Sequence, residues 1–124
     1  MGKIIEVKSE AEYSKALAEA RGQVVVEFIQ KDCGFCEDEV PRINKLVEKC
    51  PESVTVIRAD VDDLPQVAWD GFLGPEGGTP TLYLGTSEQL ANMTPEKAKQ
   101  FELDDSTALK RRLKCGRTEK PKAP

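Results

Sequence analysis

Short apolar-rich runs and stretches with helical spacing alternate along this chain. The runs at residues 4–7, 24–29, 54–61 and 81–84 have the length of β-strands. Within the second run only Glu27 is polar, which is the pattern of a strand buried on both faces. Between these runs, apolar residues recur at every third or fourth position, as on one face of a helix. The pattern predicts an α/β domain in which strands and helices alternate.

The two helices expected in the first half of the chain have recognisable ends. Ser9 is a favourable N-cap and Glu12 lies three positions later, which together form a capping box. This helix is expected to end near Gly22. The second helix is expected from Cys36 to Cys50, because Pro51 stops it. Cys50 falls on the apolar stripe of that helix, so we expect a thiol packed in the core.

The second half of the chain has a less regular pattern. Residues 65–73 have helical character. Residues 87–99 form either an insertion or an extra helix that begins at Thr94-Pro95. A last strand then leads into a helix for which Asp105 or Ser106 provides the N-cap. A fifth strand is therefore possible at the end of the sheet.

Length and charge narrow the class of protein. The chain has 124 residues, of which 39% are hydrophobic, and this suffices for one core. We assign residues 1–116 to this domain and expect the polar residues 117–124 to form a disordered tail. A net charge of −4 argues against nucleic acid as a partner. The basic residues between Lys110 and Arg117 are expected to complement the macrodipole of the last helix.

Apolar runs and the N-terminal residues indicate the cellular compartment that we expect for this protein. No apolar run approaches the ~20 residues that span a bilayer, and the N-terminus lacks the pattern of a signal peptide. We therefore expect a cytoplasmic protein without a membrane partner. A periplasmic or secreted protein whose signal peptide had been removed would have the same features.

Two cysteines three positions apart, Cys33 and Cys36, are the most informative residues of the chain. They lie between an expected strand and an expected helix, and they can form and open a disulfide without refolding of the chain. At a helix start, unpaired backbone N–H groups and the macrodipole stabilise an anion. Cys33 is therefore expected to be the more thiolate-like of the two and to act as the nucleophile.

A zinc site and a purely structural disulfide are the alternatives for this pair. Zinc needs further ligands, but the chain has no histidine, and its other cysteines, Cys50 and Cys115, stand far apart. A bridge across so few residues restricts the unfolded chain very little. Redox chemistry without a metal or cofactor is thus the preferred interpretation. Cys115 has no identifiable partner and is expected to be an exposed, inert thiol.

The segment VVVEFIQKDCGFC resembles the central strand and active-site turn of the thioredoxin-like family. Pro41 stands at the family's kink in the active-site helix, and VTVIRADVDD is similar to the next strand, with Arg58 at the usual Lys position. GGTPT matches the loop that holds a cis-proline, here Pro80. The resemblance covers about residues 4–84. It implies a thioredoxin fold, with a central mixed β-sheet of four to five strands flanked by helices on both faces.

This resemblance also implies roles for individual residues. Cys33 would attack a substrate disulfide, and Cys36 would resolve the mixed disulfide that forms. Glu27 stands where thioredoxins carry a buried carboxylate, and burial raises a carboxyl pKa, so Glu27 is expected to be a proton acceptor. The implied substrate-binding residues are Gly34, Phe35, Thr79 and Pro80.

The sequence departs from thioredoxins proper beside both cysteines. Those proteins have Trp before the first cysteine and Gly-Pro between the two, where this chain has Asp32 and Gly34-Phe35. Protein-disulfide-isomerase-like relatives also replace that proline, so the subfamily stays open. We expect a thiol–disulfide oxidoreductase with disulfide-containing protein substrates and a thioredoxin-reductase-like electron donor. The alternative is a redox-sensitive thioredoxin-fold binding module without significant turnover.

Overall fold

The computed structural model describes residues 1–115 and contains a five-stranded sheet with the order β1-β3-β2-β4-β5. Neighbours β1, β3 and β2 pair in parallel, whereas β4 is antiparallel to β2 and β5 is antiparallel to β4. The strands are β1 (Lys3–Val7), β2 (Gln23–Ile29), β3 (Val54–Asp60), β4 (Thr81–Gly85) and β5 (Glu102–Leu103). The predicted mixed sheet is thereby confirmed. The tail predicted at residues 117–124 lies outside the described residues.

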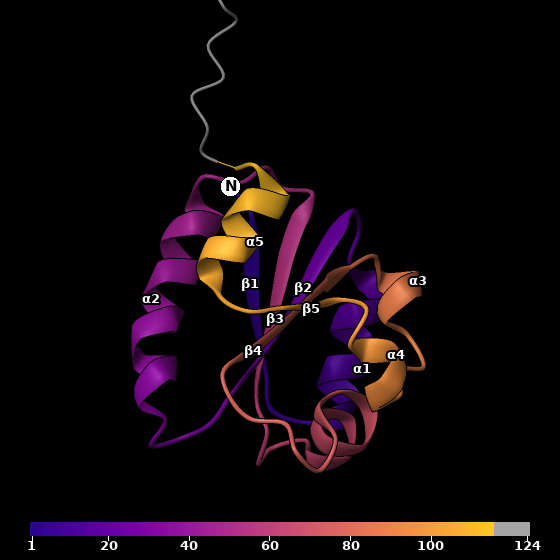
Figure 1. The fold of residues 1–124 in the computed structure, drawn as a ribbon. Coiled ribbons are helices and arrows are strands. Elements are labelled where there is room, and N and C mark those ends of the chain that lie inside the picture. Colours follow the sequence, from indigo (N-terminus) through magenta and orange to yellow (C-terminus); the bar gives the residue numbers. More distant parts are fainter. Residues whose placement is uncertain (116–124) are drawn as a thin grey trace, which may run out of the picture.

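Helices cover both faces of this sheet (Figure 1). One face carries α2 (Gly34–Glu48) and α5 (Ser106–Leu113). The other face carries α1 (Glu10–Glu19), η1 (Gln66–Leu73), α3 (Ser87–Leu90) and α4 (Pro95–Ala98). The η1 segment is a π-helix, and the N–H of Gly74 donates to the carbonyl of Trp69 at 2.8 Å, five positions earlier.

The central strand β2 divides the interior into two cores. Val24, Val26 and Phe28 belong to the core beneath α1 and η1, and each is completely buried. Val25 belongs to the core beneath α2 and α5, as do Ile43, Leu109 and their neighbours. Successive side chains of a strand point to opposite faces, so a strand covered on both sides needs apolar residues at nearly every position. Glu27 breaks this rule on the α2 side, where it lies between Val25 and Ile29 of the same strand face.

Most predicted helix starts agree with the structure. The N–H of Glu12 donates to Ser9 Oγ at 3.1 Å, and the Glu12 carboxylate accepts from the N–H of Lys8 at 2.8 Å. The Glu12 carboxylate thus accepts from the residue before the N-cap, whereas the expected capping box would have it accept from the N–H of Ser9 itself. Asp105, rather than Ser106, is the N-cap of α5, because its carboxylate accepts from the N–H of Ala108.

The two remaining cysteines contradict their predicted states. Cys50 and Cys115 form a disulfide with their Cα atoms 4.8 Å apart, although 65 positions separate them in the sequence. Cys115 is 5% exposed, so the prediction of an exposed free thiol was wrong. Cys50 is buried as expected, but it is half of a disulfide rather than a free thiol. The packing of Leu109 and Leu113 against α2 brings Cys115 to the end of that helix, where Cys50 lies.

Within residues 1–115, no helix combines the length and the apolar content that crossing a bilayer requires.

Candidate active site

The Cys33–Cys36 disulfide lies at the start of α2, directly after the turn that follows β2. Cys33 is the N-cap, so the helix begins two residues earlier than the sequence predicted. The backbone N–H of Cys36 donates to Cys33 Sγ at 3.1 Å. This donor and the positive end of the α2 macrodipole would stabilise negative charge on the same sulfur after reduction. Cys33 is partly exposed, whereas Cys36 is 4% exposed.

A loop from the other half of the chain meets this disulfide. The carbonyl oxygen of Thr79 lies 3.5 Å from Cys33 Sγ, and the Thr79–Pro80 peptide bond is cis, as the resemblance implied. Phe35 stands beside them with 76% of its surface exposed. Phe35, Thr79 and Pro80 line a cavity of about 390 Å³, which we call the active-site groove. Its lining residues are Phe35, Asp38, Glu39, Arg42, Thr79, Pro80, Asp104 and Asp105.

Glu27 is completely buried and paired with a cation from the next strand. Register places it opposite Arg58 of β3, whose Nε donates to Glu27 Oε1 at 2.6 Å. Arg58 also donates from Nη2 to Asn44 Oδ1 of α2 at 2.8 Å. Among the described residues, Glu27 Oε2 has no hydrogen-bond partner.

The environment of Glu27 favours its neutral form. Burial raises the pKa of the Glu27 carboxyl above its usual value, and the attraction and hydrogen bond of Arg58 offset only part of this effect. Repulsion from Glu39 and Glu6 raises the pKa further. A carboxyl group in such a setting can accept and release a proton at a higher pH than an exposed one.

Glu39 is a residue near the site whose contacts sequence reasoning missed. It accepts hydrogen bonds from the N–H of Ser106 at 2.7 Å and from Ser106 Oγ at 2.8 Å. Arg42 Nη1 donates at 3.1 Å to Glu39 Oε1, the oxygen that also accepts from Ser106 Oγ. The carboxylate therefore ties the active-site helix to the N-terminus of α5, which favours negative charge. The sequence did contain a signal for this buried role: Glu39 lies four residues before Ile43, on the apolar stripe of α2.

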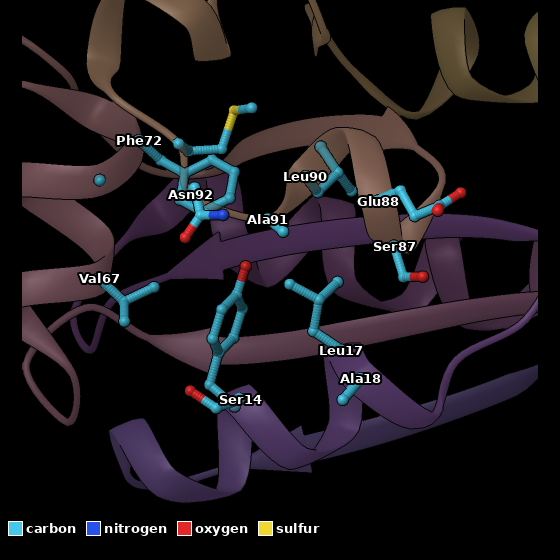
Figure 2. A pocket seen from close by; sticks show the side chains of 13 residues that line it. Ser14, Leu17, Ala18, Val67, Phe72, Ser87, Glu88, Leu90, Ala91 and Asn92 are labelled. Atoms are coloured by element: carbon cyan, nitrogen blue, oxygen red, sulfur yellow. The ribbon is translucent and has the colours of Figure 1, made fainter.

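A larger cavity than the active-site groove lies away from this site. It measures about 480 Å³ and lies between α1, η1 and α3, where Leu17, Val67 and Leu90 line it (Figure 2). Tyr13 also lines it, and burial raises the pKa of its hydroxyl, which has no hydrogen-bond partner among the described residues. Within residues 1–115, no group of three or more His, Cys, Asp or Glu side chains could hold a metal ion.

Comparison with known proteins adds independent information. The family model described as thioredoxin matches residues 4–108. Thioredoxin-2 of Saccharomyces cerevisiae is 35% identical over 65 residues, which are 52% of this chain and 62% of that protein, so less than two thirds of the relative is spanned.

Two solved structures have the same fold. Oxidised mitochondrial thioredoxin 3 of Saccharomyces cerevisiae has a TM-score of 0.65 and 22% identity, with coverage of 90% of this chain and 93% of that chain. A chain from a structure on the thiol-resolving mechanism in yeast mitochondrial 1-Cys peroxiredoxin via glutathione/thioredoxin systems has a TM-score of 0.63 and 22% identity, with the same coverage of 90% and 93%. The family match over most of the chain and the Cys33–Cys36 disulfide at the start of α2 show that this chain belongs to the thioredoxin family.

Proposed function

We propose that this protein reduces or exchanges protein disulfides through the Cys33–Cys36 couple. The observation that carries the proposal is the position of Cys33 Sγ. Cys33 is the more exposed of the two residues, and its Sγ accepts the N–H of Cys36 at 3.1 Å and faces the Thr79 carbonyl at 3.5 Å. Family membership supports the same class of reaction.

The reaction begins with the reduced pair. The Cys33 thiolate attacks one sulfur of the substrate disulfide, and the other substrate sulfur leaves as a thiolate. Cys36 then attacks Cys33 Sγ, which releases the second substrate thiol and leaves the Cys33–Cys36 disulfide. Two electrons have passed to the substrate. A dithiol donor, thioredoxin-reductase-like by the family resemblance, returns the pair to its reduced state.

Four residues at the surface of the disulfide are proposed to bind the substrate. Phe35 offers an exposed apolar side chain, and Thr79 offers backbone groups to an extended segment. Gly34 precedes Phe35 and carries no side chain, and a Cβ there would meet no atom within 4 Å, so the space beside the disulfide is open. Pro80 completes the surface.

Glu27 is proposed to accept the proton of Cys36 in the second step. Its support is complete burial on the α2 side of β2 together with a raised pKa. A general base is most effective when its pKa approaches the working pH. The proton would pass through water, because no direct hydrogen bond joins the two side chains among the described residues.

Trapping tests the proposal directly. Cys36→Ser removes the resolving thiol, so a mixed disulfide to Cys33 should accumulate when the reduced variant meets a disulfide-bonded model protein. Mass spectrometry after digestion locates the adduct. An adduct mainly at Cys50 or Cys115, or no adduct, would contradict the assignment. Repeated turnover by the wild type with a chemical dithiol donor excludes the binding-module alternative, which requires only one round of oxidation.

The second disulfide bears on the compartment in which the protein works. The sequence favours the cytoplasm. The buried Cys50–Cys115 bond is a structural disulfide, however, and such disulfides form and persist mainly in oxidising compartments. We therefore propose the periplasmic or secreted alternative. Alkylation of free thiols in intact cells before lysis tests it, and free Cys50 and Cys115 in most molecules would favour the cytoplasm instead.

A further inference from the structure

A second groove runs between α2 and α5, beside the active-site helix. It measures about 310 Å³, and we call it the α2–α5 groove. Its lining residues are Arg42, Lys45, Leu46, Lys49, Ser106, Thr107, Lys110 and Cys115. Half of these residues are cations, and none is an acid. The groove is therefore positively charged, although the net charge of the chain is −4.

The three lysines of this groove lack acidic partners among the described residues. Arg42, Lys45 and Lys49 recur at spacings of three and four, so they share one side of α2. Lys110 of α5 stands on the opposite wall. Among residues 1–115, the three lysines form no ion pair, and Arg42 pairs only with Glu39, which Ser106 also holds. Unpaired like charges that line one groove attract an anionic ligand.

The α2–α5 groove adjoins the active-site groove, because Arg42 lines both. Glu39 and Ser106 join their walls by hydrogen bonds. A segment that reaches the disulfide can therefore continue past Arg42 along α2. The active-site groove itself has exposed carboxylates at Asp38, Asp104 and Asp105, which repel acidic residues close to the reacting cysteine.

We propose that the α2–α5 groove binds an acidic segment of the disulfide-bearing protein substrate. Arg42 and Lys49 lie nine and sixteen positions after Cys33, or roughly 14 and 24 Å along a helix. An extended chain covers these distances in about four and seven residues. The preferred substrates thus carry acidic residues about four to seven positions from the cysteine that Cys33 attacks. This inference rests on the proposed disulfide exchange.

Peptides of one length test the proposal. Each contains a cysteine held in a mixed disulfide with a chromogenic thiol, a neutral spacer, and three Glu, three Gln or three Lys residues at the predicted distance. The second-order rate constant of reduction by the reduced wild-type protein is measured at low and at high salt. We expect the Glu peptide to react about fivefold faster than the Gln peptide at ~0.05 M ionic strength. The Glu-to-Gln rate ratio should approach one near 0.5 M ionic strength, where charges more than about 5 Å apart are largely screened from each other.

Charge reversal then assigns the effect to this groove. The triple variant Lys45→Glu, Lys49→Glu, Lys110→Glu should lose or invert the Glu-to-Gln rate ratio. The milder Gln substitutions at the same positions should bring the ratio to about one, and they guard against misfolding of the reversed variant. Thermal unfolding of both variants is compared with that of the wild type.

A matched control separates local from overall charge. Lys15, Lys97 and Lys99 are exposed on α1 and around α4, on the other face of the sheet, and their reversal to Glu changes the net charge equally. This control should keep the preference for the Glu peptide. Equal loss in control and groove variants would overturn the proposal.

The outcomes also separate this inference from the proposed function. Reduction of all three peptides at equal rates would overturn the acidic docking site and leave disulfide exchange intact. No reduction of any peptide would overturn the proposed function. Competition by a short single-stranded DNA that is stronger than competition by the free Glu peptide would assign the groove to nucleic acid and also overturn the inference.

Discussion

Replacement of Glu27 by Gln tests the least usual feature of the interior. Glu27 is 0% exposed, its Oε1 accepts from Arg58 Nε at 2.6 Å, and its Oε2 has no partner among the described residues. Gln has the same size and keeps a carbonyl oxygen for Arg58. The substitution therefore removes the negative charge while it preserves the packing and the hydrogen bond.

The expected size of the effect follows from two opposing contributions. Two charges about 4 Å apart attract by about 4 kcal/mol at an effective dielectric constant of 20. Removal from water costs several kcal/mol for each buried ion, and here burial dominates because the pKa of Glu27 is raised despite Arg58. An unpaired amide N–H costs about 1–3 kcal/mol and offsets much of the gain from removing the buried charge. We expect a net gain of about 1 kcal/mol in the unfolding free energy near pH 8.

The pH dependence has a definite sign. A carboxyl whose pKa is higher in the folded state stabilises the fold fully below its unfolded pKa of about 4.3. That stabilisation is lost as the pH rises through the folded pKa of Glu27, which burial raises. The Gln side chain does not titrate. The advantage of the variant should therefore grow as the pH rises above about 4 and become constant above the folded pKa.

Urea unfolding of the oxidised protein between about pH 4 and pH 8 measures this difference. Glu6→Gln is the control, because Glu6 lies 3.9 Å from Arg58 but has 65% of its side chain exposed. The control should change stability by less than about 0.5 kcal/mol at every pH. A loss of about 3–5 kcal/mol in Glu27→Gln near pH 8 would refute the reasoning, because it would mean that Arg58 requires the ionised carboxylate.

Three further variants address other parts of the molecule. The double variant Cys50→Ala, Cys115→Ala should have an unfolding free energy lower by about 4 kcal/mol, because a bridge across 65 positions no longer restricts the unfolded chain. Unchanged denaturant unfolding would show that the bond does not form in solution. Tyr13→Phe removes a buried hydroxyl without a partner among the described residues, so thermal unfolding should show equal or higher stability, by up to about 1 kcal/mol, and a loss would reveal a partner for that hydroxyl. Phe35→Ala should change stability by less than about 0.5 kcal/mol because Phe35 is 76% exposed, yet it should lower kcat/KM for protein disulfides; an unchanged kcat/KM would remove Phe35 from the substrate surface.

Local patterns predicted most of the fold correctly. The apolar run around Glu27 predicted a strand covered on both faces, and β2 has helices on each side. The start of α2 was predicted two residues late, because Cys33 caps the helix with its sulfur and cysteine is not a usual N-cap residue. The strand and helix near Asp105 were also predicted, since caps and short apolar runs depend on neighbouring residues.

Contacts between distant segments could not be predicted in this way. The bond between Cys50 and Cys115 forms because α5 packs on α2, and the apolar faces of the two helices do not specify which cysteines will meet. The hydrogen bonds between Glu39 and Ser106 span 67 positions and depend on the same packing. The cations of the α2–α5 groove come together for this reason too.

The sequence by itself determined the family, the alternation of strands and helices, and the pair of cysteines at a strand–helix junction, because each is encoded within a few neighbouring residues. The tertiary structure alone decided the partners of distant groups: Arg58 beside Glu27, Ser106 beside Glu39, and the second disulfide. The physical reason is that strand register and helix packing choose contacts between distant residues by the total burial of apolar surface, which no local pattern contains.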